Sequence, residues 1–367
     1  MTDTEACIAI NMIPKMGPVR LRKLLEIFQT PQRILEAKPH ELRSVDGIGK
    51  EVAKTVADWE QHVDLAAELK RIADFGAQVL TQSSADYPSS LREIHTAPIV
   101  LYVWGKLEPR DGQHAIGIVG SRHASHYGLE CAKKLSYQLA YAGVTVVSGL
   151  ARGIDTAAHQ GALAANGRTV AVLGSGLQKI YPRENAGLAE KIASGSGAVI
   201  TEFSMDTQAD TQTFPMRNRI VAGWGSGVLV VEAGLNSGAL ITATQATDCG
   251  RSVYAVPGQI DRPTCTGSNR LIQQGAKLVT NASDILDDMQ ILFPETRQPQ
   301  PPASSRADAL TGEERLVFDA LDQSETGIDE IIAKTNLPTG KVSSTLLALE
   351  MKRLVKQLPG QHFVKLR

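Results

Sequence analysis

The sequence predicts an α/β protein built on a doubly wound parallel sheet, with a small all-α domain before the sheet and a winged-helix-like domain after it. Between residues 115 and 293, short, nearly all-apolar segments rich in β-branched residues alternate with helical segments. Strand–helix repeats of this kind form parallel sheets that helices cover on both faces. Residues 1–76 show helical periodicity only, and a proline-rich segment separates the sheet region from residues 308–367.

The composition is that of an ordinary globular protein. Of 367 residues, 43% are hydrophobic and 21% are charged, which excludes a disordered chain. The net charge is −1, so any nucleic-acid site must be a local patch. No segment approaches the ~18 apolar residues of a membrane span, and the N-terminus lacks the features of a signal peptide. We therefore expect a cytoplasmic protein that does not contact a membrane.

Cysteine spacing argues against a metal site. None of the four cysteines, at positions 7, 131, 249 and 265, forms a Cys-x-x-Cys pair. We expect reduced cysteines that pack as small apolar residues, with no metal and no cofactor.

The N-terminal domain, predicted at residues 1–76, consists of short amphipathic helices at 19–28, 51–59 and 65–75. Gly47-Ile48-Gly49 lies between the first two helices. A turn of this kind presents backbone N–H groups that bind phosphate, or it simply allows a tight helix connection through a positive φ. The sequence favours the second interpretation, because two glycines are a weak signal.

The core domain, predicted at residues 77–293, contains the candidate strands. They lie at residues 115–119, 144–147, 169–173, 198–201, 228–231, 253–256 and 277–279. The helices between them are predicted at residues 128–142, 155–166, 185–193 and 239–249. Residues 78–105 are expected to add one or two edge strands.

Residues 294–307 contain four prolines and no large apolar residue, which predicts an extended linker. Helices at 311–321, 327–335 and 339–353, followed by strands at 355–358 and 363–366, outline a winged helix. Residues 341–367 carry six basic residues and one acid. This basic end fits nucleic-acid contact, but docking to a protein partner or a purely structural role stays equally open.

Several enzyme signatures are absent. No G-x-G-x-x-G dinucleotide fingerprint follows a strand, and the chain has no P-loop. It also lacks the H-E-x-x-H and G-x-S-x-G motifs of metalloproteases and serine hydrolases.

Small-residue turns instead follow four predicted strands. They are Gly120-Ser121-Arg122, the Ser148-Gly149 turn with Arg152, Gly174-Ser175-Gly176, and Ser237-Gly238. Ligands of open parallel sheets bind at the carboxyl ends of the strands, where glycines allow close approach and N–H and O–H groups bind phosphate. Four such turns at one edge predict an elongated anion with several phosphates.

Residues 214–219, Phe-Pro-Met-Arg-Asn-Arg, open a further helix and combine an aromatic ring with cations. Single-stranded nucleic acid binds such combinations through base stacking and backbone neutralisation. We favour a ligand role for Arg217 and Arg219 over ion pairs with Glu202 or Glu232, and leave Phe214 open between ligand and core. Asp155 and His159 share a helix face, but no nucleophile is near, so a structural role is expected.

In combination, these turns resemble the DprA/Smf family of DNA-processing proteins. The matching segments are residues 117–122, 148–159, 181–185, 201–203, 214–220, 237–242, 256–258 and 267–269. The resemblance covers about residues 85–290 and is looser at both ends.

The resemblance implies an extended Rossmann core that binds single-stranded DNA without catalysis and forms a homodimer. It implies a role in natural transformation (competence) and DNA recombination, in which the protein guards incoming strands and helps the recombinase RecA to load. It further implies an N-terminal domain of the SAM or helix-hairpin-helix kind. By match to the motifs, DNA contact falls on Ser121, Arg122, Ser148, Gly149, Arg217 and Asn218, with Lys179 as a further cation.

The residues themselves add Gly120, Arg152, Phe214, Arg219, Ser237 and Gly238 to this candidate interface. The family places self-association near Leu271, Ile272 and Leu278.

Two alternatives remain open. One is a nucleotide phosphoribohydrolase of the lysine-decarboxylase-like group, which shares this type of sheet. That group uses a Gly-Gly-x-Gly-Thr turn followed by a glutamate, whereas here Ser237-Gly238-Ala239 is followed by no glutamate before Cys249. The missing general base argues against hydrolysis. The other alternative is an adaptor that binds proteins.

Overall fold

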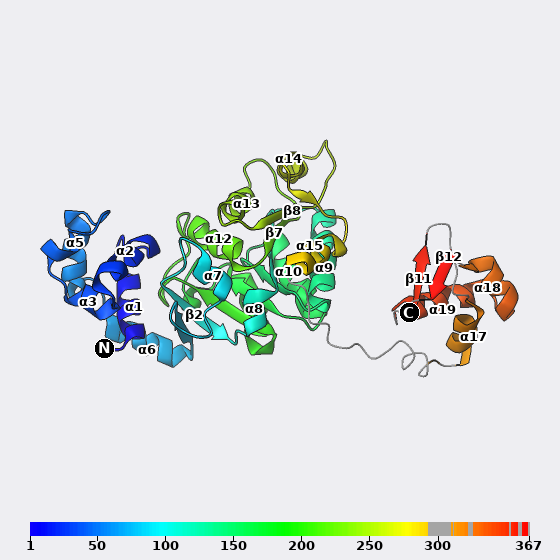
Figure 1. Ribbon diagram of the computed structural model, residues 1–367, viewed down its shortest axis with the longest axis horizontal. Helices are drawn as coiled ribbons and strands as arrows, with labels where there is room; N and C mark the ends of the chain where they lie inside the picture. The colour runs from blue at the N-terminus through cyan, green and yellow to red at the C-terminus, as the bar shows by residue number, and fades with distance from the viewer. Residues whose placement is uncertain (293–309, 311, 322–325, 352–353, 359–361, 366–367) are drawn as a thin grey trace. The chain divides into compact units, whose positions relative to one another are not determined.

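The computed structural model describes residues 1–292, 310, 312–321, 326–351, 354–358 and 362–365 (Figure 1). The predicted linker at 294–307 lies outside the described residues. The chain divides into two compact units, Met1–Phe293 and Pro294–Arg367. Because the N-terminal helices and the sheet belong to the same unit, the boundary predicted between residues 76 and 77 stays a prediction.

The N-terminal part of the first unit is all helical. Its elements are α1 (Asp3–Met12), α2 (Pro18–Phe28), α3 (Pro31–Glu36), α4 (Pro39–Leu42), α5 (Lys50–Ala57), a 3-10 turn at Trp59–Gln61, and α6 (Leu65–Phe75). Helix α1 was not predicted from the periodicity, because it buries five consecutive residues, Ala6 to Ile10, which is more than one turn, rather than one stripe. The Thr2 side chain caps its first turn with Glu5 in a capping box.

The Gly47-Ile48-Gly49 turn connects α4 to α5. Gly47 has a φ of +83°, a conformation that glycine adopts without strain, and Gly49 precedes the first turn of α5. Lys23 pairs with Asp46 beside the turn at 2.6 Å. These contacts fit the tight helix connection, and phosphate binding here stays a prediction.

A nine-stranded sheet forms the core of the first unit, in the order β1-β2-β6-β5-β4-β3-β7-β8-β9. The strands are β1 (Gln78–Thr81), β2 (Val100–Gly105), β3 (Ala115–Val119), β4 (Thr145–Ser148), β5 (Thr169–Val172), β6 (Gly197–Thr201), β7 (Gly227–Val230), β8 (Ser252–Ala255) and β9 (Lys277–Leu278). Strands β3 to β9 are mutually parallel, whereas β1 and β2 are antiparallel and continue the sheet beyond β6. The predicted doubly wound sheet and its edge strands are confirmed.

Helices cover both faces of this sheet (Figure 1). On one face, α9 (His126–Tyr141), α10 (Ile154–Ala164) and α15 (Ser283–Leu292) enclose a core with Ile116, Val146 and Tyr254. On the other face, α7 (Ser89–Glu93), α12 (Thr213–Trp224) and α13 (Gly238–Asp248) pack on Val147, Val170 and Val228. The remaining short helices are α8 (Pro109–Gln113), α11 (Ala186–Lys191) and α14 (Thr266–Gln273).

The second unit has the predicted winged-helix outline. It contains α17 (Gly312–Ala320), β10 (Thr326–Gly327), α18 (Ile328–Thr335), α19 (Thr339–Met351), β11 (Val355–Leu358) and β12 (His362–Lys365). The short β10 adds a strand to the predicted hairpin, in the order β10-β12-β11. Two of the predicted cations have partners within the unit, because Lys341 pairs with Glu313 and the Lys365 ammonium lies 4.8 Å from the Phe318 ring centre.

No helix in the described part of the chain is long and apolar enough to cross a membrane.

Candidate nucleic-acid interface

The strand order has a topological switch point between β3 and β7. The chain passes from β3 through β4 and β5 to β6 on one side, and then returns to place β7, β8 and β9 on the other side of β3. Loops that follow β3 and β7 therefore leave in opposite directions, which is where open α/β sheets bind ligands. We call the loops after β3, β4, β5 and β7 the carboxyl edge. The four predicted turns all lie on it.

Arg122 occupies the loop after β3 and is exposed. Its guanidinium carbon lies 4.7 Å from the centre of the Phe214 ring, a cation–π contact. It forms no ion pair with any carboxylate in the described part of the chain. Glu232, named above as a possible ion-pair partner of Arg217 or Arg219, instead accepts hydrogen bonds from the backbone and hydroxyl of Ser125.

Close backbone packing fixes the loop that carries Arg122. The Ser121 N–H donates to the Glu232 carbonyl at 2.7 Å, and its hydroxyl accepts from the His123 N–H. A Cβ on Gly120 would lie 2.6 Å from the Ile154 side chain, and one on Gly153 would lie 2.3 Å from the Ser121 carbonyl oxygen. The glycines thus let two loops of the carboxyl edge touch.

The loop after β4 is held from within by a buried carboxylate. Asp155 accepts from the Gly149 N–H at 3.1 Å and from the Ala151 N–H at 3.4 Å. Burial raises the pKa of Asp155, because the loss of water outweighs the attraction of Arg217 and these two bonds. Ser148 is fully buried and donates its hydroxyl to the Ile118 carbonyl at 2.6 Å.

Arg217 joins the ends of β4 and β5 beneath the surface. It is only 4% exposed, and its Nη1 donates to the carbonyls of Gly149 and Val172. Asn218 accepts from its Nε at 3.1 Å. Burial lowers the pKa of Arg217 to about 10, with the nearby Arg122 charge acting in the same direction. Arg217 therefore supports the loops from inside rather than standing at the surface.

Arg219 adopts the ion pair that the sequence had left as the alternative. Its Nη2 donates to the Glu202 carboxylate, and both side chains are nearly buried. Burial raises the pKa of Glu202 despite this pairing. The two arginines of the 214–219 segment thus have internal partners, and Phe214 is the half-buried residue of that segment that reaches the edge.

The segment after β5 adds Tyr181, which the sequence analysis matched within residues 181–185 but did not count among the site residues. The Tyr181 ring is 46% exposed and lies 5.8 Å from the Phe214 ring, on an edge that also carries Arg122. The Ser175 hydroxyl is buried and has no hydrogen-bond partner among the described residues. An aromatic residue shortly after the Gly174–Gly176 turn was the available signal for Tyr181.

Two residues near Tyr181 brace the loop after β4. Asn185 donates to the Leu150 carbonyl at 2.8 Å, where Leu150 has a φ of +55°. Arg152 forms a two-bond ion pair with Glu184, at 2.7 and 2.8 Å, and about half of each side chain is exposed. A phosphate at Arg152 must therefore compete with Glu184.

The remaining predicted contacts are accessible. Lys179 is exposed and has no ion-pair partner among the described residues. Ser237 caps α13 by accepting from the Ala239 N–H, and Gly238 has open space where a side chain would stand.

His159 has the expected structural role. Its ring is fully buried, and Nδ1 lies 2.7 Å from the Thr169 hydroxyl, which itself donates to the Val146 carbonyl. Because that hydroxyl's proton is used, Nδ1 is the donor and the ring is neutral. Burial lowers the pKa of His159 to about 3. No group of histidine, cysteine and acidic side chains in the described residues could hold a metal ion.

The residues predicted for self-association lie on β9, the last strand of the sheet, and on the preceding helix α14. Leu278 is 44% exposed on β9, the last strand of the sheet, whereas Leu271 and Ile272 are half-buried on α14.

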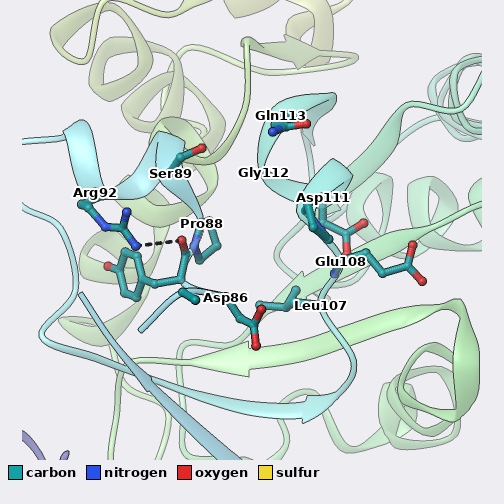
Figure 2. Close-up of a pocket in the computed structure, with 12 residues that line it drawn as sticks. Asp86, Pro88, Ser89, Arg92, Leu107, Glu108, Asp111, Gly112 and Gln113 are labelled. Atoms are coloured by element: carbon teal, nitrogen blue, oxygen red, sulfur yellow. Dashed lines mark hydrogen bonds between the residues drawn. The ribbon is translucent and has the colours of Figure 1, made fainter. Parts of the chain in front are cut away.

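A pocket of about 170 Å³ lies near the opposite end of the strands, where α8 leads into β3 (Figure 2). Asp86, Arg92 and Glu108 are among its lining residues, and Arg92 donates to the Tyr87 carbonyl. Asp111, also in the lining, pairs with Arg168 at 2.6 Å. This pocket does not belong to the carboxyl edge.

The fold places the protein among the doubly wound α/β proteins, a class in which ligands bind at the carboxyl ends of the strands. The chain belongs to the DNA recombination-mediator protein A family, whose model matches residues 78–290. A DprA winged helix domain model matches residues 299–361, and a SAM-like helix-hairpin-helix tandem model matches residues 9–58. The resemblance predicted from the motifs is confirmed.

Similar proteins cover most of the chain. Protein Smf of Synechocystis is 34% identical over 97% of both chains. DNA processing protein DprA of Bacillus subtilis is 41% identical over 58% of this chain and 72% of its own. The crystal structure of DprA from Streptococcus pneumoniae has a TM-score of 0.68 at 33% identity, covering 78% of this chain and 98% of its own.

A Helicobacter pylori DNA processing protein A, whose structure is described for its single-stranded DNA binding mode, has a TM-score of 0.53 at 25% identity. It covers 59% of this chain and 98% of its own.

Proposed function

We propose that this protein binds single-stranded DNA along the carboxyl edge of its sheet and catalyses no reaction on it. The observation that carries the proposal is Arg122, an exposed guanidinium that lies on an aromatic ring and has no carboxylate partner in the described chain. A guanidinium in this state binds a phosphate oxygen, and neighbouring rings offer a surface to an unpaired base. The single-stranded DNA binding mode described for the Helicobacter pylori relative supports the same ligand.

The proposed surface contacts are those that reach solvent or lie in the loops beside Arg122. They comprise Gly120, Ser121, Arg122, Arg152, Lys179, Phe214, Asn218, Ser237 and Gly238. Gly149 is buried, with its N–H bonded to Asp155 and its carbonyl bonded to Arg217, so it belongs to the support of this surface. Ser148, Arg217 and Arg219 support this surface from within, because their side chains already bond to the Ile118 carbonyl, to the ends of β4 and β5, and to Glu202.

Within the cell, we propose that the protein acts as a cytoplasmic homodimer in natural transformation and recombination, where it protects incoming strands and helps RecA to load. Membership of the DNA recombination-mediator family supports this role. Nuclease protection of a labelled single strand, and RecA filament growth on strands coated with single-strand-binding protein, test its two parts. A protein that binds the strand but changes neither readout contradicts the role in transformation.

The alternative of a nucleotide phosphoribohydrolase makes a different prediction. Ser237-Gly238-Ala239 opens α13 without a following glutamate, so a general base is missing there. Binding of single-stranded against double-stranded DNA, measured beside hydrolysis of nucleoside monophosphates, separates the two functions. We expect preferential single-strand binding and no released base; hydrolysis without DNA binding would favour the enzyme.

A further inference from the structure

A buried carboxylate from the N-terminal helices reaches a loop of the sheet. Glu68 of α6 is fully buried, and its Oε1 accepts a hydrogen bond from the Met205 N–H at 2.8 Å. Its Oε2 lies 3.2 Å from Arg71, which also lies 3.6 Å from Asp206. A charged residue is rarely buried unless it is paired, so this arrangement is costly to change.

The same loop has a second attachment to the N-terminal helices. Asn11 of α1 donates to the Glu202 carbonyl at 2.8 Å. The Met205 side chain is fully buried in a cluster with N-terminal residues that include Ile10 and Ile72. Residues 202–207, which follow β6, are thus held at Glu202, Met205 and Asp206.

Residues 202–207 in turn hold the loop that follows β5. The Thr207 carbonyl accepts from the Gly176 N–H at 2.9 Å, and the Met205 carbonyl accepts from the Gln178 N–H at 3.0 Å. A Cβ on Gly176 would lie 2.2 Å from the Ser204 carbonyl oxygen, so the two segments are in close backbone contact. Neither segment can shift alone without breaking these bonds.

The loop after β5 belongs to the proposed DNA surface. Lys179 ends its 3-10 turn, with its N–H bonded to the Gly176 carbonyl at 3.0 Å. Gly174 lies beneath Phe214, where a Cβ would come within 2.9 Å of the ring. The bonds therefore run from Glu68 through residues 202–207 to the loop that presents Lys179 and supports Phe214.

We propose that Glu68 is a positioning residue for DNA binding: through residues 202–207, it sets the place of Lys179 and of the loop beneath Phe214. Glu68 itself is buried and does not touch DNA. This inference rests on the proposed function.

The test compares three variants of the full chain for binding to a fluorescein-labelled oligo-dT strand by anisotropy. Glu68→Ala removes the acceptor for the Met205 N–H, and we expect binding about three- to tenfold weaker. Glu68→Gln keeps an acceptor oxygen and should bind within about twofold of the parent. Val56→Ala, at a fully buried position of α5, destabilises the N-terminal helices without removing a hydrogen bond to residues 202–207 and should bind normally.

Hydrogen exchange gives a readout that general destabilisation does not move. In Glu68→Ala the amides of Gly176 and Gln178 should exchange faster, although neither contacts residue 68, while Val56→Ala leaves them unchanged. Loss of a properly placed Lys179 should also make the salt dependence of binding shallower by about 0.7 in log–log slope.

The inference is overturned if Glu68→Ala binds DNA like the parent, or if Val56→Ala weakens binding equally. Should Glu68→Ala fail to fold, Asn11→Ala is measured in its place, because it removes the bond to Glu202 that also holds residues 202–207. Binding as tight as that of the parent then overturns the inference. Arg122→Ala is run in parallel: if it too leaves binding unchanged, the proposed function fails, whereas weak binding by Arg122→Ala alone removes only the role of Glu68.

Discussion

The guanidinium of Arg122 lies 4.7 Å from the centre of the Phe214 ring, although Arg122 follows β3 and Phe214 lies in the first turn of α12, after β6. The contact positions the cation, and among the described residues its N–H groups have no hydrogen-bond or ion-pair partner, so they can bind a phosphate. It also leaves part of the ring edge and the neighbouring Tyr181 available to a base. A cation and an aromatic surface at one edge are what a single strand needs and what a duplex, with its bases stacked inside, cannot fully use.

Salt dependence should report how many phosphates the edge neutralises. Arg122, Arg152 and Lys179 are the exposed cations proposed as DNA contacts, and each phosphate neutralised contributes about −0.7 to the slope of log K against log salt for a single strand. We therefore expect a slope of about −2 for oligo-dT and a similar slope for oligo-dC, measured by anisotropy on the full chain. A slope near zero would mean that phosphates do not dominate.

An added methyl group should destabilise the protein at one glycine of the edge and leave stability unchanged at another. A Cβ on Gly149 would lie 2.3 Å from the Arg217 guanidinium, so Gly149→Ala should lower the free energy of unfolding by about 1–3 kcal/mol and weaken DNA binding. Gly238 has open space around it, so Gly238→Ala is the matched control, expected within about 0.5 kcal/mol of the parent. Urea unfolding measures both, and equal stabilities would refute the role given to Arg217.

The pH dependence of stability should carry the signature of His159. Its pKa is about 3 in the folded protein against an ordinary value of 6.5, so the unfolded chain binds a proton that the folded one does not as pH falls below 6.5. Stability attributable to His159 is therefore lost between about pH 6.5 and pH 3. From pH 7 to pH 5 the parent should lose about 2 kcal/mol more than His159→Gln in urea unfolding. Identical losses would show that the ring is not held neutral.

Self-association should depend on the β9 end of the sheet. Leu278 is exposed on this last strand, so glutamate substitution of Leu271, Ile272 and Leu278 together should yield monomers in light scattering. Because Leu271 also packs on the sheet core, Leu278→Glu alone is the milder test. Ile27→Glu, at an exposed apolar position of α2, is the control and should stay dimeric. If the protein with all three changes is still a dimer, the interface lies elsewhere on the molecule.

Helices and strands with a clear local hydrophobic pattern could be predicted from the sequence. The hydrogen-bond and ion-pair partners of the polar side chains could not. The strand at 115–119 was predicted to the residue, because a strand buried on both faces is apolar at every position. Nothing in the sequence tells that Arg217 bonds to carbonyls across two strands while Arg219, two residues on, pairs with Glu202. Those contacts depend on the direction in which each side chain points from α12 and on which strand ends lie there.

The burial of Glu68 was equally beyond the pattern. A glutamate on an amphipathic helix such as α6 is expected to face solvent. In the structure Glu68 is instead fully buried and accepts the Met205 N–H. Helix α1 was missed for a related reason, since a helix enclosed on several sides lacks the single stripe that periodicity detects.

The measurement that tests the account most directly is single-strand binding by Arg122→Ala. Arg110→Ala, an exposed arginine on α8 near the opposite strand ends, removes the same charge and is the matched control. We expect Arg122→Ala to bind oligo-dT at least about tenfold more weakly, with a Tm within about 3 °C of the parent, Arg122→Lys to recover part of the loss, and Arg110→Ala to bind normally. A folded Arg122→Ala protein that binds the strand as tightly as the parent would contradict the assignment of the carboxyl edge as the DNA site.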